Sequence, residues 1–330
     1  MSGPHSHLRF LFLTLPATLA FPMHAQASPP IERDLPAGTP VALRVERVLD
    51  RAELTRLGAP NPSRLVFDAD GSLYALDPGR RRVIKLDPRG APMLEWGGYG
   101  GDEESFSIPS DLAIDRRQSL LVLDRGKNQV AAFDGMGRYL GYRALGEDIR
   151  SDALDPAARL LVDPFGELWL VAVRERDLVE LNDRLERERR TRYLAPEESI
   201  GALGAVAFLP AQGGWLHDSG NRLLRRFGAG GRLLGSIPLV DSTGTTVPSD
   251  LACDTGGSLY VADAEGQRVL VYSSTGRLEL TRQLGGSGIP WIPRAIAVSR
   301  FDRVAIADPA RGEIQILSVQ RSAPVKERAP

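Results

Sequence analysis

The sequence predicts an all-β protein built from repeated four-stranded antiparallel units, and three observations support this. Apolar runs of five or six residues are separated by turns rich in Gly, Asp and Ser, as in residues 247–278. These turn residues supply the backbone conformations that tight hairpins require. The composition agrees, because 34 Gly and 24 Pro accompany only 6% aromatic residues. The third observation is that this pattern of apolar runs and turns, which we call the repeat phrase, recurs along most of the chain.

Six units share this phrase at an almost constant interval. The residues that close the second strand of each unit are separated by 47, 48, 46, 45 and 45 residues. They are Asp77, Asp124, Ala172, Asp218, Asp263 and Asp308. A period in the mid-forties with about four strands per unit is typical of a β-propeller, so six units predict six blades. A parallel solenoid is the structural alternative, but its repeats are usually shorter and it needs no closure.

The two ends of the repeat array complement each other. The sixth unit supplies three strands and ends at Val319, and residues 320–330 are polar with two prolines. An isolated alternating run covers 41–49, before the first unit. Pairing this run with the last unit would supply the missing outer strand and close the ring. We therefore expect a propeller over 40–319, followed by a disordered tail.

The N-terminus predicts export. A polar start ends at Arg9, an apolar run covers 10–21, and Ala-Gln-Ala follows at 25–27. That order is typical of a secretory signal peptide, and the apolar run is too short for a comfortable membrane span. We expect 1–27 to be a cleaved signal and 28–39 a flexible lead-in to a monomeric periplasmic or secreted protein. An uncleaved anchor or an ordinary N-terminal helix is the alternative.

Charge and residue counts exclude several classes of function. A net charge of -1 provides no strong field for binding nucleic acid or an anionic membrane, despite arginine-rich stretches at 80–82 and 184–192. No later stretch is apolar enough to cross a bilayer. Cys253 is the only cysteine, so we expect no internal disulfide and a small buried side chain. His217 is the only histidine after the expected signal, which excludes a zinc site built from several histidines.

Four phrases resemble the NHL-repeat family of six-bladed propellers, over about 280 of the 330 residues. They are Pro-Ser-Asp-Leu-Ala-Ile-Asp at 109–115, Val-Pro-Ser-Asp-Leu-Ala-Cys-Asp at 247–254, Leu-Tyr-Val-Ala-Asp at 259–263 and Asp-Ser-Gly-Asn-Arg-Leu at 218–223. The resemblance to a bacterial exported member implies the fold but no single function. Members of the family include protein-interaction modules and RNA-binding translational regulators, and related propellers include a few lyases and lactonases. The third unit departs from the pattern at Ala172.

The aspartates in register could suggest a ring of metal ligands. However, an Asp that opens a turn accepts hydrogen bonds from backbone N–H groups two or three residues further on. Hairpin repetition alone therefore explains the pattern, and we expect no metal site from these residues.

A better candidate site is the position that enters each inner strand. Inner strands line the central channel of a propeller, so these residues should form one layer near its mouth. They are Arg64, Asp111, Arg159, Ala205, Asp250 and Arg294. Arginines in such a ring could hold a carboxylate or phosphate through forked hydrogen bonds. The alternative is that Asp111 pairs with Arg64 and Arg159 only to neutralise buried charge.

The long connections between units should lie on the same face as this mouth. They cover 97–108, 146–156, 195–204, 240–247 and 285–292. Tyr99, Phe106 and Trp291, with the acidic run 102–104, form a candidate contact surface, because exposed loop aromatics are costly without a partner. The alternative is that these aromatic residues fold back and cap the cores of the blades.

These observations favour an exported, non-enzymatic propeller that binds a protein or a small ligand on its loop-rich face. The alternative is a metal-dependent hydrolase, lactonase or lyase that acts at the channel mouth with a divalent cation. Resemblance to lactonases implies calcium held by Glu, Asn and Asp; Asp111 and Asp250 are present, but no Asn or Glu matches them. Resemblance to antibiotic-cleaving lyases offers His217 as a general base, although we expect it to pack against a neighbouring blade. The sequence therefore assigns no catalytic residue and no cofactor.

Overall fold

The protein is described from a computed structural model. The described residues are 41–146, 149, 158–163, 166–172, 177–181, 187–191, 203–209, 213–228, 232–241, 244–285 and 290–321. All helices and strands belong to the compact unit Leu35–Pro330. The expected signal peptide and lead-in, and the tail beyond Arg321, lie outside the described residues.

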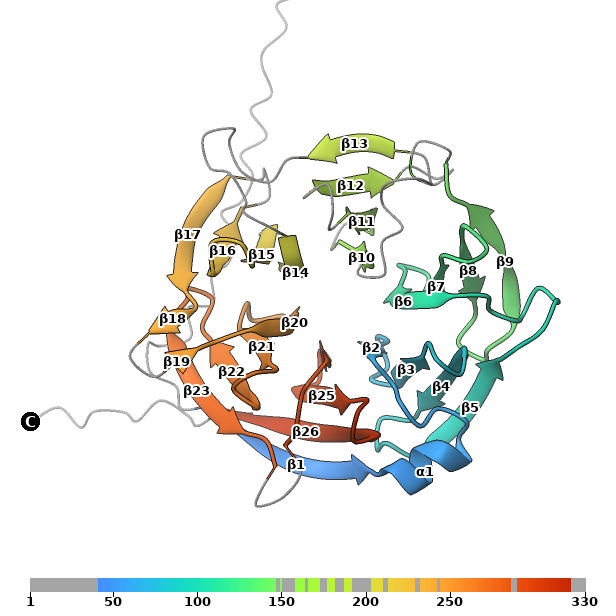
Figure 1. Cartoon of the computed structure of the whole chain (residues 1–330), viewed down its shortest axis with the longest axis horizontal. Coiled ribbons are helices and arrows are strands. Elements are labelled where there is room, and N and C mark those ends of the chain that lie inside the picture. Colours follow the sequence, from blue (N-terminus) through green and yellow to red (C-terminus); the bar gives the residue numbers. More distant parts are fainter. Residues whose placement is uncertain are drawn as a thin grey trace, which may run out of the picture. The chain divides into compact units, whose positions relative to one another are not determined.

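Six four-stranded antiparallel sheets follow one another around a central channel, so the predicted six-bladed propeller is confirmed (Figure 1). Blade 1 consists of β2 (Arg64–Phe67), β3 (Leu73–Asp77), β4 (Arg82–Leu86) and β5 (Pro92–Gly97). Blade 2 consists of β6 (Pro109–Ile114), β7 (Leu120–Asp124), β8 (Gln129–Phe133) and β9 (Tyr139–Ala144). Blade 3 consists of β10 (Arg159–Val162), β11 (Leu168–Ala172), β12 (Asp177–Leu181) and β13 (Arg187–Thr191).

The remaining blades follow the same plan. Blade 4 consists of β14 (Leu203–Leu209), β15 (Gly213–Asp218), β16 (Leu223–Phe227) and β17 (Leu233–Pro238). Blade 5 consists of β20 (Pro248–Cys253), β21 (Leu259–Asp263), β22 (Arg268–Tyr272) and β23 (Leu278–Gln283). Blade 6 consists of β24 (Ala295–Val298), β25 (Arg303–Asp308), β26 (Glu313–Arg321) and β1 (Val41–Leu49). In each blade the first repeat strand lies innermost, and the divergent third unit also forms a complete sheet.

The ring closes as the sequence predicts. β1 pairs antiparallel with β26 as the outer strand of blade 6, with a bulge between Val45 and Arg47. The ladder continues to Val41, which lies opposite Arg321. The boundary expected at Val319 is therefore wrong by two residues, because the start of β1 provides backbone partners for the end of β26.

Two small elements were not expected. Helix α1 (Arg51–Arg56) follows β1, begins at the N-cap Asp50, and buries Leu54 completely. A two-residue hairpin, β18 (Val240–Asp241) and β19 (Gly244–Thr245), lies in the connection between blades 4 and 5. Both are too short to show a periodicity in the sequence. Within the described part of the chain, no helix has the length and apolar character needed to span a membrane.

The aspartates in register accept backbone hydrogen bonds, as the turn interpretation predicts. Asp77 accepts at 3.0 Å from Arg80 N in its own turn, and Asp308 accepts at 3.1 Å from Arg311 N. The carboxylates of these aspartates also accept from the backbone that leads into the inner strand of the same blade. The donors are Asn61 N to Asp77 (2.7 Å), Ser107 N to Asp124 (2.8 Å), Val247 N to Asp263 (2.9 Å) and Ile292 N to Asp308 (2.7 Å). Each aspartate thus connects a hairpin to the chain segment that enters its blade.

The hydrophobic core lies between neighbouring blades. One cluster joins Trp215 of blade 4 to Val261 and Leu270 of blade 5. Another joins Tyr74 of blade 1 to Val122 of blade 2. Because every blade buries its faces against two neighbours, the inner strands are held in a fixed ring, and this positions the residues at the channel mouth.

Candidate functional site

Four of the six expected mouth residues form one network of ion pairs. The Asp111 carboxylate lies 3.3 Å from Nε of Arg64 and 3.0 Å from Nε of Arg159. Arg159 also reaches the Asp250 carboxylate with Nη1, at 3.2 Å. Both aspartates are buried and both arginines are partly buried. The geometry therefore matches the alternative interpretation, in which Asp111 neutralises Arg64 and Arg159.

Arg159 lies across the channel. Its two partners, Asp111 and Asp250, are on β6 and β20, which face each other across the centre of the ring (Figure 1). Blade 4, between the blades of Arg159 and Asp250, carries Ala205 at the equivalent position. This short, uncharged side chain does not separate Arg159 from Asp250. Burial lowers the pKa of the Arg159 guanidinium, but the two carboxylates raise it above its ordinary value overall. Arg159 is therefore always charged.

The two aspartates also order the next inner strand. Leu160 N donates to Asp111 at 2.7 Å, and Ile296 N donates to Asp250 at 3.0 Å. Both aspartates belong to the same Pro-Ser-Asp-Leu-Ala phrase, so the phrase connects each blade to its successor. Because these carboxylates bind arginine and backbone, they offer little to a cation. The described residues contain no group of three side chains suited to hold a metal ion.

Arg64 is less well compensated than Arg159. Its buried Nε lies near Asp111 but has no hydrogen-bond acceptor, and Nη1 donates to the carbonyl of Ser63 at 2.8 Å. Burial and the nearby charge of Arg159 lower the pKa of Arg64. An additional anion beside Arg64 would therefore relieve an electrostatic cost.

Arg294 differs from the other mouth residues. It precedes β24 and its side chain is exposed. In the described part of the chain, no ion pair connects it to Arg64, Asp111, Arg159 or Asp250.

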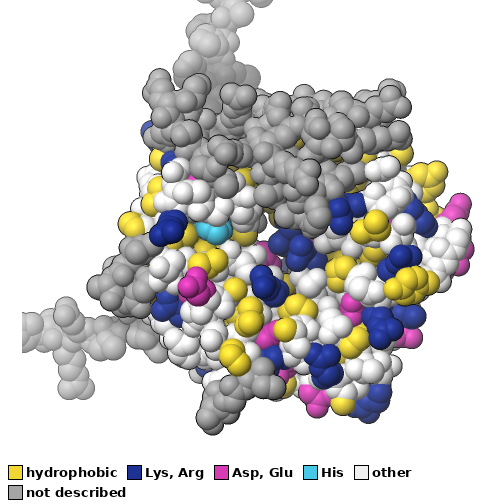
Figure 2. All heavy atoms as spheres, in the orientation of Figure 1, with side chains coloured by type: hydrophobic (Ala, Val, Ile, Leu, Met, Phe, Trp, Pro, Cys, Tyr) yellow, Lys and Arg dark blue, Asp and Glu magenta, His cyan; other side chains and the backbone are white. Residues whose placement is uncertain are grey.

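A groove of about 410 Å³ opens beside Arg64, between blades 1 and 2. Three arginines line it: Arg64, Arg81 and Arg125. Tyr99, which is 70% exposed, also lines it, and the Arg81 guanidinium lies 4.2 Å from the centre of the Tyr99 ring. Ile108 adds an exposed apolar side chain. Figure 2 shows basic side chains gathered around the hollow at the centre of this view. We call this feature the mouth groove.

Two of the three candidate contact aromatics are buried. Trp291 is 1% exposed, belongs to the core between blades 5 and 6, and donates from Nε1 to Glu313 at 3.0 Å. Phe106 packs edge-on against Phe133. The placement of Trp291 on an exposed contact surface is therefore wrong, because its ring caps a blade core. Tyr99 and the acidic run 102–104 are exposed, as expected.

His217 is buried in β15 and does not belong to the network of mouth ion pairs. Its ring lies against Gly204 of the same blade, where an added Cβ would be 2.5 Å from Nδ1. The expected packing of His217 against a neighbouring blade stays a prediction. Nδ1 has no hydrogen-bond partner, and burial lowers the pKa of His217 to about 4. The imidazole is neutral at pH 7.

Beyond the mouth, the residues along the channel are of apolar types, and most of their side chains pack into the cores between blades. A cavity of about 260 Å³ is lined by the inner strands of all six blades, and Arg159 is its single charged lining residue among those described. The layer next to the mouth residues consists of Leu65, Leu112, Leu160, Val206, Leu251 and Ile296. The sequence interpretation missed this feature, although the signal was present: three successive positions after each mouth residue are apolar in every unit.

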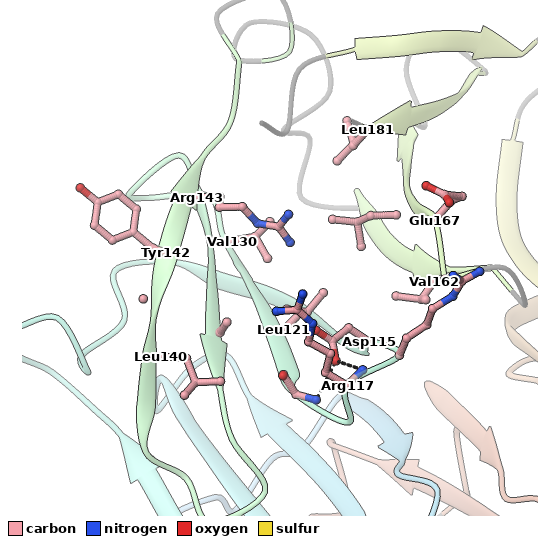
Figure 3. A pocket seen from close by; sticks show the side chains of 16 residues that line it. Asp115, Arg117, Leu121, Val130, Leu140, Tyr142, Arg143, Val162, Glu167 and Leu181 are labelled. Carbon is pink, nitrogen blue, oxygen red and sulfur yellow. Dashed lines mark hydrogen bonds between the residues drawn. The ribbon is translucent and has the colours of Figure 1, made fainter. Parts of the chain in front are cut away.

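A larger cleft of about 640 Å³ lies between blades 2 and 3 (Figure 3). Arg117, Arg143 and Glu167 line it together with aliphatic side chains such as Leu140. It includes the turn that follows β6, so it lies at the end of that strand opposite to its mouth residue. This cleft is therefore separate from the mouth groove.

No known family model matches the chain. Solved structures that resemble it include six-bladed propellers. A streptogramin B lyase aligns with a TM-score of 0.62 at 10% identity, covering 86% of this chain and 98% of the lyase. A gluconolactonase from Xanthomonas campestris aligns with a TM-score of 0.56 at 15% identity, covering 86% of this chain and 97% of the lactonase. Regucalcin from Agrobacterium tumefaciens, a calcium-binding protein, aligns with a TM-score of 0.55 at 17% identity, covering 86% of this chain and 95% of regucalcin.

These likenesses establish the fold and not the reaction. Membership of the NHL-repeat family stays a prediction from the sequence phrases.

Proposed function

We propose that the protein binds a small anionic organic molecule in the mouth groove. The observation that carries this proposal is the convergence of Arg64, Arg81 and Arg125 on one groove. A guanidinium donates paired hydrogen bonds that match a carboxylate or a phosphate. Tyr99 and Ile108 supply apolar contacts beside the charged group.

The charge balance of the mouth supports an anion over a cation. Asp111 and Asp250 balance the charges of Arg64 and Arg159, and Arg81 adds to the groove a positive charge that these two aspartates do not offset. A ligand carboxylate in the groove would accept hydrogen bonds from the Arg81 guanidinium, which lies over the exposed Tyr99 ring.

A second candidate function is catalysis at the same mouth, by a hydrolase, lactonase or lyase. The similarity to a lyase and a gluconolactonase favours it. The described residues support substrate binding better than the chemical step, since His217 is buried within blade 4 and both mouth aspartates are paired. On this proposal the arginines hold the anionic part of the substrate, and no general base is assigned.

Binding can be tested by calorimetry on the protein from Ser28 onward, with a panel of organic carboxylates and phosphates. Arg64→Gln and Arg81→Gln are each expected to weaken binding at least tenfold. The matched control is Arg277→Gln, because Arg277 is 51% exposed in a surface pair with Glu279. Thermal melting of each variant separates lost binding from lost folding. Equal affinity of folded Arg64→Gln, Arg81→Gln and unmodified protein would refute the mouth groove as the site.

The same samples test the catalytic candidate. Incubation with a panel of lactones and lyase substrates, with and without added Ca²⁺, should give turnover that Arg64→Gln reduces. Binding without turnover in either condition would favour a binding protein. A macromolecular partner captured through the exposed run 102–104, with no small anion bound, would instead support the protein-binding alternative.

A further inference from the structure

We propose that the ligand of the mouth groove is an aromatic carboxylate, and that its ring stacks on the side chain of Tyr99. The negative charge of this ligand rests on the proposed function above. Its aromatic ring rests on separate observations of the connection between blades 1 and 2.

The connection that contains Tyr99 differs from its counterparts at one position. In the connections after β5, β9, β17 and β23, one backbone N–H donates to the hairpin between the second and third strands of the blade just completed. After β5 this donor is Gly98, which binds the carbonyl of Arg81 at 2.7 Å. After the other three strands the donors are leucines that are at most 5% exposed, namely Leu145, Leu239 and Leu284. Gly98 therefore lacks the side chain that caps a core in the other connections.

Phe106 supplies the missing cap, so the core does not need Tyr99. The Phe106 ring is 1% exposed and belongs to the core between blades 1 and 2. It lies so close to Gly97 that an added Cβ there would be 2.5 Å from the ring. Tyr99 is 70% exposed. A large aromatic side chain that lies exposed beside a groove, without packing into a core, is typical of a contact site.

The Tyr99 ring is held in a fixed position at the groove. Its hydroxyl donates to the Gly79 carbonyl at 3.1 Å, and the Arg81 guanidinium covers one face of the ring. The backbone is also fixed, because the Gly98 carbonyl accepts from Phe106 N at 3.3 Å. The opposite face of the ring is open to a ligand. A ring that is fixed before binding loses little conformational freedom when a ligand covers it.

The surroundings of Tyr99 favour an aromatic acid as the ligand. Two aromatic rings attract each other beyond the contribution of their buried area. The groove volume of about 410 Å³ lies within the roughly 300–1,000 Å³ of small-molecule sites, so it accommodates a substituted benzene ring. Ile108, which is 49% exposed, adds a second apolar surface to the groove. The arginines of the same groove match the carboxylate.

The experiment is calorimetric titration with benzoate and with cyclohexanecarboxylate, which have equal charge and similar size. Stacking on Tyr99 is expected to make benzoate bind about twofold to tenfold more tightly. Tyr99→Leu should abolish this preference and leave the affinity for cyclohexanecarboxylate unchanged. Tyr99→Phe should retain the preference, because the aromatic ring remains. Benzyl alcohol, titrated in parallel, has the ring without the charge.

A matched control tests whether the effect belongs to Tyr99. Tyr142 is 56% exposed on β9 and does not line the mouth groove, so Tyr142→Leu should bind both acids as the unmodified protein does. Arg64→Gln should weaken both acids equally and leave the ratio of their affinities unchanged. The tyrosine variants are expected to fold because both side chains are exposed, and thermal melting checks this.

The outcomes separate this inference from the proposed function. Equal affinities for benzoate and cyclohexanecarboxylate, or a preference that persists in Tyr99→Leu, would overturn the contact with Tyr99 and leave the anion site standing. Benzyl alcohol that binds as tightly as benzoate, and only when Tyr99 is present, would support the ring contact and refute the anionic groove. Absence of binding by all three probes would refute both.

Discussion

Asp111 is the central residue of the charge network at the channel mouth. It faces Arg64 and Arg159 and also accepts a hydrogen bond from Leu160 N. A buried ion pair adds little net stability, because desolvation offsets the attraction. Removing one partner is different, since it leaves the other charge buried and unpaired.

Asp111→Ala is therefore expected to lower the free energy of unfolding by about 3–5 kcal/mol. Asp111→Asn should cost less, because the amide oxygen can still accept from Leu160 N. Chemical denaturation measures both. Glu95→Ala, which removes an exposed pair with Arg82, is the control and should cost about 1 kcal/mol or less. Equal losses for Asp111→Ala and Glu95→Ala would show that the network is not buried in solution.

His217 makes stability depend on pH in a defined direction. Its pKa in the folded protein is about 4, against an ordinary value of 6.5. Between these values the unfolded chain binds a proton that the folded protein does not bind. Stability is therefore lost as pH falls from 6.5 toward 4, and the histidine has no such effect above pH 6.5.

The expected loss from His217 over that interval is about 3 kcal/mol. His217→Asn removes the titrating group, so the variant should lose less stability than the unmodified protein between pH 7 and pH 4.5. Denaturant midpoints at several pH values measure the difference, and the carboxylates shared by both proteins cancel in the comparison. Parallel curves for the two proteins would contradict the buried, neutral histidine.

At the scale of elements, β1 completes the last blade and contacts the one before it. Leu43 and Leu49 of β1 are buried, and Arg282 of blade 5 donates to the Leu43 carbonyl at 2.6 Å. Without β1, the edge of β26 would be exposed and three aliphatic side chains, Val41, Leu43 and Leu49, would be lost from the core. An exposed strand edge is a template for association between chains.

A protein that begins at Asp50 is therefore expected to melt at a lower temperature and to self-associate. Burial of each lost Leu alone is worth roughly 1.5–3 kcal/mol. A synthetic peptide of residues 40–50 should restore a monomer and the melting transition, whereas a scrambled peptide should not. Light scattering and thermal melting provide the measurements. If the protein without β1 stays monomeric and melts at the same temperature, closure of the ring contributes little to stability.

At the scale of the whole molecule, we propose that the propeller is exported, because a signal-peptide pattern precedes it in the sequence. The expected signal peptide lies outside the described residues, so this proposal depends on the sequence.

Expression of the full chain in a Gram-negative host is expected to yield a protein in the periplasm or medium that begins at Ser28. Mass spectrometry of the intact protein measures this. Ala27→Lys should block processing, because cleavage needs a small residue before the cut. Folded protein that retains residues 1–27 in the cytoplasm would contradict export.

The sequence by itself determined the blade count, the strand positions and the closing strand, because hairpin turns and apolar alternation are local signals. It also placed Arg64, Asp111, Arg159 and Asp250 in one layer, since repeat register fixes height along the channel. The sequence could not show that Tyr99 is exposed and Trp291 is buried, because each residue lies in a connection of the same kind between two blades. Only the tertiary structure shows which ring packs into a core.

The pairing within the mouth layer was also decided only by the tertiary structure. Arg159 contacts Asp250, on a blade two places further along the ring, because the short Ala205 stands between them. Such a contact depends on how six sheets meet around an axis. Local patterns set where each charge lies along its strand, while the closed ring determines which charges meet and which stay available for a ligand.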